Sequence, residues 1–455
     1  MTPSRLPFEL DAGIDESLVT ARAGVPLVVE LFRVSGAAGV MDARASRKRR
    51  RRGLSASAMA EGLFALWTAG GERCEDLDAL REDRALAVLL GHEVPASQTA
   101  RDFLEGFHDQ DAPPLWTGEK SGVPAESAAL AGLHETLRTV TAHLQARRPQ
   151  AEATLDVDAT ILESRKRSAR PTYDGRLGYQ PVVCLWAEQD QIVAEEFRDG
   201  NVPAGSGNRR VVERAVASLP PGVERVRLRG DSALYEQELL RWLAGRGIEF
   251  AVSADLSREL AQAIGALPES AWAVDAQEAD AVREWAEVAF VPEDLSRRKD
   301  APAFRYLAFR VTKRQGALFP DGGPRRHFAV VTNRTGDGLS ILRWHRKKAG
   351  TIEHAHHVLT NELAAEALPS QKFGADAAWF RLNAVLYNLL SAFKRIALPE
   401  DLHPARPKRL RFLLFTTIGK VVRHGRETLL RLTSEAHRAL YDRARLLISC
   451  PALAP

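Results

Sequence analysis

The order of strand-like and helix-like segments between residues 151 and 255 constrains the fold more than any other feature. The run ATLDVDATI alternates apolar and polar residues with the period of a half-buried strand, and YQPVVCLWAE and QIVAEEF continue as strands. The chain then reads as helix, strand, helix and strand through RRVVERAVASL, VRLRGD, LYEQELLRWLAGRG and IEFAVSA. Three strands in sequence followed by crossover connections predict an α/β layer.

The segments on either side of this layer have a different character. Residues 1–150 are predicted to be mainly helical, because apolar residues recur at helical spacing in SAMAEGLFALWTAG and LREDRALAVLLG. Residues 256–345 are predicted to be β-rich, since WAEVAFV, FRYLAFRVT and HFAVVTN are separated by Gly- and Pro-rich turns. Residues 346–455 return to helical patterns and end in a basic tail. The chain is therefore divided at about residues 150, 255 and 345.

Carboxylates stand on two of the predicted strands of the 151–255 layer. Asp231 follows the strand RVRLRG, where a lone Asp is more often a helix cap, because it accepts from free backbone N–H groups. Asp156 and Asp158 lie on one face of an earlier strand, since side chains alternate with period two. For either of these, contact with solvent or with an arginine is the alternative. Carboxylates that meet across a sheet repel each other unless a cation such as Mg²⁺ offsets them.

A third acid is expected after the β-rich segment. Glu353, in AGTIEHAHHVL, falls in the first turn of a predicted helix and can face the sheet. Complementing the helix dipole is the alternative for an acid at that place. Glu362 and Glu366, further along the same helix, are fallback candidates. Glu195 and Glu196 lie on a strand and are interpreted as an exposed edge pair.

Composition bounds the class of protein. The chain has 455 residues, 45% hydrophobic and 27% charged, with a net charge of +4, which is typical of a globular protein. Its three cysteines lie far apart, which supports neither a disulfide framework nor a zinc ribbon. His354, His356 and His357 lack a nearby cysteine, so phosphate contact or exposure is favoured over zinc. No signal-peptide pattern or membrane-spanning run is evident, so a cytoplasmic protein is expected.

The most basic stretch is RASRKRRRRG, residues 44–53. A run of like charges is usually solvated, but it can also lie along a phosphate backbone, and we interpret it as a nucleic-acid contact. The candidates in it are Arg47, Lys48, Arg49, Arg50, Arg51 and Arg52. Downstream, Ser97 is the predicted N-cap of PASQTARDFLEGF, whose short polar first turn suits a DNA-reading helix or a capped surface helix.

The order LDVDAT, RGDSALY and GTIEHAHHVLTNEL, with a β-rich segment before the Glu, resembles the aspartate-aspartate-glutamate (DDE) transposases of bacterial insertion sequences. Within these, the chain is most similar to insertion-sequence group 1380, a relative of group 4. EEFRDGN and RLNAVLYNLLSAFKR also resemble that family, and the resemblance covers about residues 150–400. It implies an α/β fold with an RNase H-like core, interrupted by a β-rich insertion and preceded by a mainly helical DNA-binding region.

The resemblance also assigns the acids. The family's first acid begins an Asp-x-Thr run, which places it at Asp158 rather than Asp156. RGDS places the second acid at Asp231, and the third falls on Glu353. These residues are implied to hold two Mg²⁺ ions, for which Mn²⁺ can substitute, that activate the attacking oxygen and stabilise the leaving oxygen.

Residues around the Glu depart from the family pattern. The group 4 relatives carry a Tyr, an Arg and a Lys at fixed offsets, where this chain has Arg346, Ala349 and Thr360. Trp344, Lys347 and Lys348 lie nearby and would substitute in a shifted register. The departure concerns how a terminal phosphate is held, and not the three carboxylates. The DNA-binding candidates here are Trp344, Arg346, Lys347 and Lys348, with a partly buried core position as the alternative for Trp344.

The predicted function is a DNA transposase that cuts at the terminal inverted repeats of its element and joins the ends to target DNA. The implied partners are double-stranded DNA and a second copy of the chain, as a homodimer on paired ends at the nucleoid. One alternative is a catalytically silent DNA-binding protein derived from a transposase. The other is a metal-dependent nuclease of the same fold without strand transfer.

Overall fold

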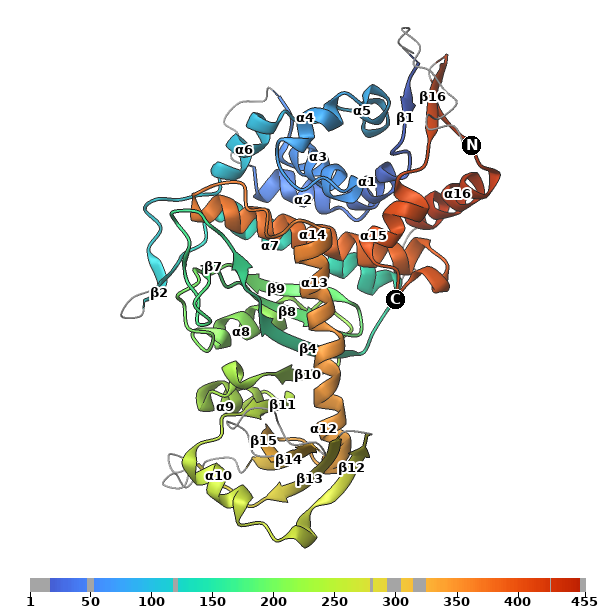
Figure 1. Ribbon diagram of the computed structural model, residues 1–455. Coiled ribbons are helices and arrows are strands. Elements are labelled where there is room, and N and C mark those ends of the chain that lie inside the picture. Colours follow the sequence, from blue (N-terminus) through green and yellow to red (C-terminus); the bar gives the residue numbers. More distant parts are fainter. Residues whose placement is uncertain are drawn as a thin grey trace, which may run out of the picture.

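A large mixed sheet forms the centre of the molecule (Figure 1). The computed structural model describes residues 17–46, 53–117, 122–278, 281–292, 304–313, 325–425 and 427–450. Among them, nine strands pair in the order β12-β13-β14-β15-β11-β10-β4-β8-β9. The three central strands are parallel, namely β4 (Glu152–Ala159), β10 (Arg225–Gly230) and β11 (Glu249–Ala254). On one side, the antiparallel strands β8 (Val182–Trp186) and β9 (Gln191–Glu196) complete this half.

The alternation of β4 separates an apolar face from the face that carries the acids. Ala153, Leu155 and Val157 pack into a core with the crossover helices α8 (Asn208–Ser218) and α9 (Gln237–Gly245). Asp156 and Asp158 instead contact the segment between residues 347 and 351. The predicted order of strands and helices between residues 151 and 255 is therefore confirmed.

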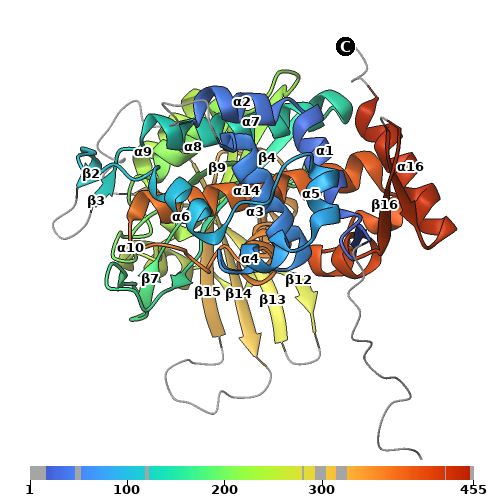
Figure 2. The ribbon, with the colours of Figure 1, turned by 90° about the horizontal axis from the view of Figure 1, so that it is seen from above.

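The β-rich segment extends the same sheet. Its strands are β12 (Ala273–Gln277), β13 (Ala281–Val288), β14 (Arg305–Lys313) and β15 (Arg325–Thr332), which lie side by side in Figure 2. β15 pairs antiparallel with β11, so no break separates these strands from the central ones. The described residues of this segment also form the α-helices α10 (Arg258–Gly265) and α12 (Gly338–Arg346), the second of which ends just beyond it.

A layer of two long helices lies between the sheet and the N-terminal helices (Figure 1). It consists of α7 (Ala128–Arg147) and α14 (Phe373–Ala397), both of which contact β9. Above it lie α1 (Val25–Val34), α2 (Ala37–Arg44), α3 (Ala56–Ala69), α4 (Asp76–Arg81), α5 (Arg84–Leu90) and α6 (Ser97–Glu105). The described part of the chain before residue 150 is thus mostly helical.

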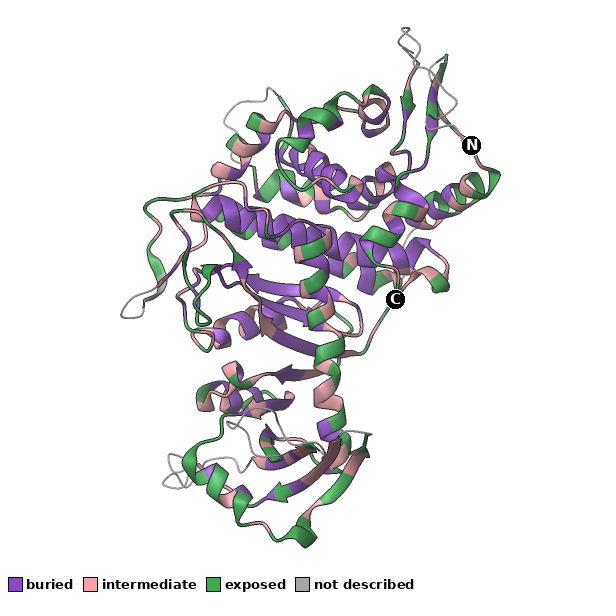
Figure 3. Cartoon of the chain, viewed as in Figure 1, coloured by how far each residue is buried: buried purple, intermediate pink, exposed green. Residues whose placement is uncertain are grey.

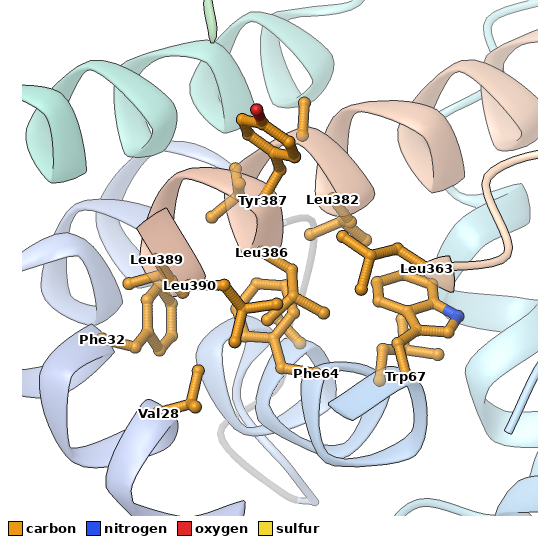
Figure 4. Packing of buried hydrophobic residues seen from close by; sticks show 14 of the residues in the cluster. Val28, Phe32, Phe64, Trp67, Leu363, Leu382, Leu386, Tyr387, Leu389 and Leu390 are labelled. Atoms are coloured by element: carbon orange, nitrogen blue, oxygen red, sulfur yellow. The ribbon is translucent and has the colours of Figure 1, made fainter. Parts of the chain in front are cut away.

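The α14 helix is buried along nearly its whole length (Figure 3). Leu382, Leu386 and Leu390 pack against the N-terminal helices, which contribute Phe32 and Phe64 (Figure 4). In the same core, the rings of Trp67 and Trp379 meet edge to face with centroids 4.7 Å apart. One apolar core therefore joins the N-terminal helices to the helix that covers the sheet.

Helices α12 and α13 (Ile352–Glu362), joined by a 3₁₀ turn over Lys347–Gly350, form a rod beside the sheet (Figure 1). The rod runs from the β12–β15 end of the sheet to α14. The sequence pattern predicted a helix only from about residue 345, whereas α12 begins at Gly338, where the Asp337 side chain caps it.

Short strands add to this framework. The strands β5 (Leu162–Glu163), β7 (Leu177–Tyr179) and β6 (Arg170–Pro171) form a small sheet after β4, and β2 (Pro114–Thr117) pairs with β3 (Gly122–Pro124). In the basic tail, α15 (Pro407–Leu410) precedes a hairpin of β16 (Gly419–His424) and β17 (Glu427–Leu432), and α16 (Glu435–Ser449) follows. Because β1 (Val19–Thr20) pairs with β16, segments from the two ends of the chain meet.

The interpretation of Glu195 and Glu196 as an exposed pair is wrong. Both side chains are buried, because α7 and α14 contact β9, and so does α8. Glu195 accepts a hydrogen bond from Arg381 of α14. Glu196 accepts from Arg198 Nε and Arg210 Nε, each at 2.7 Å. β9 ends the sheet, but the helices that cover it remove its side chains from water.

Candidate active site

Asp158 and Asp231 meet where two parallel strands end. The register pairs Val157 of β4 with Gly230 of β10, and the pairing of these two strands ends there, so Asp158 and Asp231 come next at the same edge. Asp158 still pairs with Val183 of β8, whereas Asp231 follows the end of β10. The two side chains line the same cavity, and the charge of Asp158 is near enough to raise the pKa of Asp231. Asp231 Oδ1 also accepts from the Ala233 N–H at 3.1 Å and caps the short turn that follows. Asp231 therefore caps the turn and also lies beside the carboxylate of Asp158.

The charges of this pair are only partly neutralised. Burial and the neighbouring charge of Asp158 raise the pKa of Asp231, while the ammonium group of Lys348 opposes the shift. Lys348 Nζ lies 3.0 Å from Asp158 Oδ2, and its side chain is 13% exposed. One lysine thus faces two carboxylates in a largely dehydrated place, which is an environment that favours binding of a further cation.

Asp156 lies two residues before Asp158 on the same face of β4 and has a structural role. Its carboxylate accepts from Arg229 Nε at 2.6 Å and Nη2 at 2.7 Å, and the Thr351 hydroxyl donates to it as well. Burial raises the pKa of Asp156, and the Arg229 hydrogen bond opposes that rise. Because this carboxylate is already used by an arginine, Asp158 is the acid of β4 that faces the cavity.

The rod of α12 and α13 is bonded to the ends of both strands. His345 Nε2 donates to the carbonyl oxygen of Gly230 at 3.0 Å, and burial lowers the His345 pKa to about 4, so the ring is neutral at pH 7. Lys348 and Thr351 bond to Asp158 and Asp156 in the next turns. The rod therefore fixes the geometry at the edge where the two acids lie.

A cavity of about 680 Å³ opens at this edge. Asp158 and Asp231 line it together with Tyr173 and Arg176 of the β6–β7 turn. Asp255 lines it too, because it follows β11 as Asp231 follows β10. Sequence reasoning missed Asp255, although the run IEFAVSAD carries the same signal of an acid after a strand.

The predicted third acid does not join the pair. Glu353 is exposed in the first turn of α13 and is not among the residues that line the cavity. Helical phase explains this, because Ile352 and Ala355 are the residues buried against the core, and each residue turns about 100° from the last. Within the described residues, no three His, Cys, Asp or Glu side chains are arranged to hold a metal ion.

Of the two fallback acids, Glu362 is the last residue of α13, whereas Glu366 lies beyond the end of that helix, so its predicted place on the helix is wrong. The Glu362 carboxylate is 4% exposed and accepts from the Lys408 N–H at 2.7 Å, so it serves the C-terminal segment. Glu366 is exposed and lines a neighbouring cavity of about 980 Å³, which shares Arg176 with the first. Burial lowers the pKa of His356 to about 4, opposed by the nearby charge of Asp158.

The DNA-binding candidates divide between paired and exposed side chains. Arg47, Lys48, Arg49, Arg50, Arg51 and Arg52 lie outside the described residues. Lys347 is exposed. Arg346 pairs with Asp275 at 2.6 Å, and Lys348 is held by Asp158. The Trp344 ring is occupied by the guanidinium groups of Arg334 and Arg229, which lie 4.4 and 5.2 Å from its centroid.

The helix α6 also differs from its prediction. It begins at Ser97 and is preceded by Ala96, so the assignment of Ser97 as the N-cap is wrong. The Ser97 N–H and hydroxyl instead bond to Asp78 of α4 at 3.0 and 2.6 Å. Arg101 pairs with Glu75, so these polar groups of the helix are used within the N-terminal region.

Comparison with known proteins gives the family. A family model described as "Transposase DDE domain group 1" matches residues 10–446. The chain therefore belongs to the DDE transposases of this group. No curated protein sequence matches it significantly. Among solved structures, it is similar to a piggyBac transposase determined by cryo-EM in a synaptic complex with hairpin DNA, at 12% identity and a TM-score of 0.43, over 85% of this chain and 78% of that chain.

Proposed function

We propose that this protein is a DNA transposase of insertion-sequence group 1380. It cuts at the terminal inverted repeats of its element and joins the ends to target DNA. The observation that carries the proposal is the contact of the Asp158 and Asp231 carboxyl groups at the ends of parallel strands, on the wall of an open cavity. Membership of the DDE family supports the class of reaction.

An RNase H-like core is part of the proposal. Its support is the strand order β9-β8-β4-β10-β11, in which β4, β8 and β9 are antiparallel and β10 and β11 run parallel to β4. Helices α8 and α9 connect the later strands. The strands β12 to β15 are then an insertion that lengthens the sheet of the core.

A divalent cation, Mg²⁺ or Mn²⁺, is the cofactor that DDE transposases use. The donor set fits in part, since two oxygen-rich side chains are in contact and a lysine ammonium already lies against one of them. Asp158 and Asp231 would hold the ion. The resemblance makes Glu353 the proposed third ligand, and to reach the ion Glu353 would have to move from its exposed place outside the cavity. Bound there, the ion would activate an attacking oxygen and stabilise a leaving one.

The remaining roles are filled by side chains of the protein itself. Lys348 offsets part of the charge of the acid pair, and His345 and Thr351 hold the rod in register with the strand ends. Exposed Lys347 and the basic run at residues 47–52 are proposed to contact DNA phosphates, which would make DNA binding weaken as the salt concentration rises.

Two copies are proposed to act on paired ends at the nucleoid. Among the described helices, none combines the length and apolarity needed to cross a bilayer.

The first experiment is a cleavage assay on labelled DNA that carries the ends of the element. Wild type should nick at the ends with Mg²⁺ and not with EDTA, and Asp231→Asn should lose cleavage by at least about 100-fold, because removing a charged acid raises the barrier by several kcal/mol. Binding of the ends should persist in the variant. Binding by wild type with no cleavage in Mg²⁺ or Mn²⁺ would instead indicate the catalytically silent DNA-binding protein.

A matched pair of variants tests which residue is the third acid of the site. Glu353→Gln should abolish cleavage, whereas Asp255→Asn, in the same cavity as the acid pair, should leave it largely intact. The reverse result would remove Glu353 from the site. Products that join an end to a target plasmid distinguish a transposase from a nuclease, which would cut without joining.

A further inference from the structure

The turn between β6 and β7 holds an aromatic ring in water at the rim of the acid-lined cavity. Tyr173 is 80% exposed and lines the cavity with Asp158 and Asp231. An aromatic ring exposed to this degree gains nothing from the hydrophobic core, so its position is not explained by packing.

Hydrogen bonds fix the turn that carries Tyr173. The Thr172 N–H donates to the Arg176 carbonyl at 2.7 Å, and Thr172 Oγ1 donates to Asp174 Oδ1 at 2.6 Å. Arg176 Nε donates back to Asp174 Oδ2 at 2.7 Å. Gly175, with φ at +85°, supplies the left-handed residue that closes the turn. The ring is therefore held outward by its backbone, while the hydroxyl and ring faces stay free of the small sheet.

The other aromatic side chain considered for DNA contact is already covered. Two arginine guanidinium groups lie within 5.2 Å of the Trp344 ring centroid, and the backbone carbonyl of Trp344 accepts from Arg229. Trp344 is thus part of the support for Arg229 and the buried Asp156. Of these two aromatic rings, that of Tyr173 is therefore the one left open to DNA.

We propose that Tyr173 is a stacking platform for an unpaired nucleobase of the DNA end that lies at Asp158 and Asp231. This inference rests on the proposed function and names a further contact of the same site. A nucleobase can stack face to face on the ring of Tyr173, because both are flat. The cavity has a volume of about 680 Å³, within the range of about 300–1,000 Å³ that is common for small-ligand sites. Arg176 lines the same cavity, where its guanidinium is paired with Asp174 and Glu163.

The test is a double-mutant cycle between the ring and the base. Binding is measured in EDTA, so that no DNA is cut, with end DNA that carries one abasic position in turn at each unpaired nucleotide beside the cleavage site. Wild type should bind the intact end about 5- to 100-fold more tightly than one of the abasic ends. Tyr173→Ala should bind both equally, and Tyr173→Phe and Tyr173→Trp should keep the preference.

Phe412→Ala is the matched control, because Phe412 is 78% exposed but does not line the cavity. It should keep the wild-type preference for the intact end. Equal discrimination by wild type and Tyr173→Ala at every position, with cleavage by wild type intact, would overturn the inference and leave the proposed function standing. Absence of both end binding and cleavage by wild type would instead reject the proposed function itself.

Discussion

Asp158, Asp231 and Lys348 form a charge arrangement in which one ammonium group faces two carboxyl groups. The Lys348 side chain is 13% exposed and that of Asp158 is 19% exposed, so water screens the interaction only in part. Burial and the charge of Asp158 both raise the pKa of Asp231. The protein therefore tolerates the acid pair because Lys348 offsets part of the repulsion.

Lys348→Met should destabilise the metal-free protein by roughly 1.5–3 kcal/mol, because a hydrogen bond between charged groups is lost and the acids face each other alone. Chemical denaturation in EDTA at pH 7 measures the change in the free energy of unfolding. Lys347→Met, at the exposed neighbouring position, should change it by less than about 0.5 kcal/mol. Equal losses in the two variants would refute the role given to Lys348.

At the scale of elements, α14 and α7 are joined to the sheet by a buried ionic group. Arg381 of α14 donates to Glu126 at 2.7 Å and also to Glu195 of β9. His134 of α7 lies beside this group, with its Nε2 3.0 Å from Ser218 Oγ of α8. Burial and the charges of Arg381 and Arg214 lower the His134 pKa to about 3.

This pKa gives a pH dependence of known sign. Because the folded protein keeps His134 neutral while the unfolded chain takes up a proton near pH 6.5, stability is lost as pH falls from about 6.5 towards 3. Between pH 7 and pH 5, wild type should lose about 1–2 kcal/mol more than His134→Gln, measured by denaturant titration at each pH. His424→Gln, at an exposed position, should follow wild type. Parallel curves for His134→Gln and wild type would contradict this assignment.

At the scale of the whole molecule, the site is assembled from segments that are far apart in the chain. Asp158 and Asp231 come from the ends of β4 and β10, and Lys348 from the rod that follows the β-rich segment. The rod reaches them because β12 to β15 continue the same sheet and return the chain to its centre. Folding of this segment is thus a condition for the geometry of the acid pair.

A divalent cation should therefore stabilise the folded molecule as a whole. Millimolar Mn²⁺ or Mg²⁺ should raise the thermal midpoint, with about 2.7 kcal/mol of stabilisation when the ion is 100-fold above its dissociation constant. Asp231→Asn should abolish the shift, and Asp255→Asn should keep it. An unchanged midpoint for wild type up to saturating metal would contradict binding at the acid pair in the absence of DNA.

Much of the central fold was predictable from local pattern. The strands and helices between residues 151 and 255 follow from alternation and helical spacing, which also put Asp231 directly after a strand. The small sheet of β5, β6 and β7 was not predictable, because its strands have two or three residues each and carry no periodic signal. The role proposed for Tyr173 was not predictable either, because it depends on the cavity beside this residue.

The sequence by itself determined the alternation of β4, the order of the crossover helices and the family, because these depend on neighbours along the chain. Only the tertiary structure decided which acids meet and which do not. Asp158 and Asp231 meet through strand register, whereas the phase of α13 leaves Glu353 exposed. It likewise decided the burial of Glu195 and Glu196 and the covering of Trp344, since the helices and arginines that surround them come from distant segments.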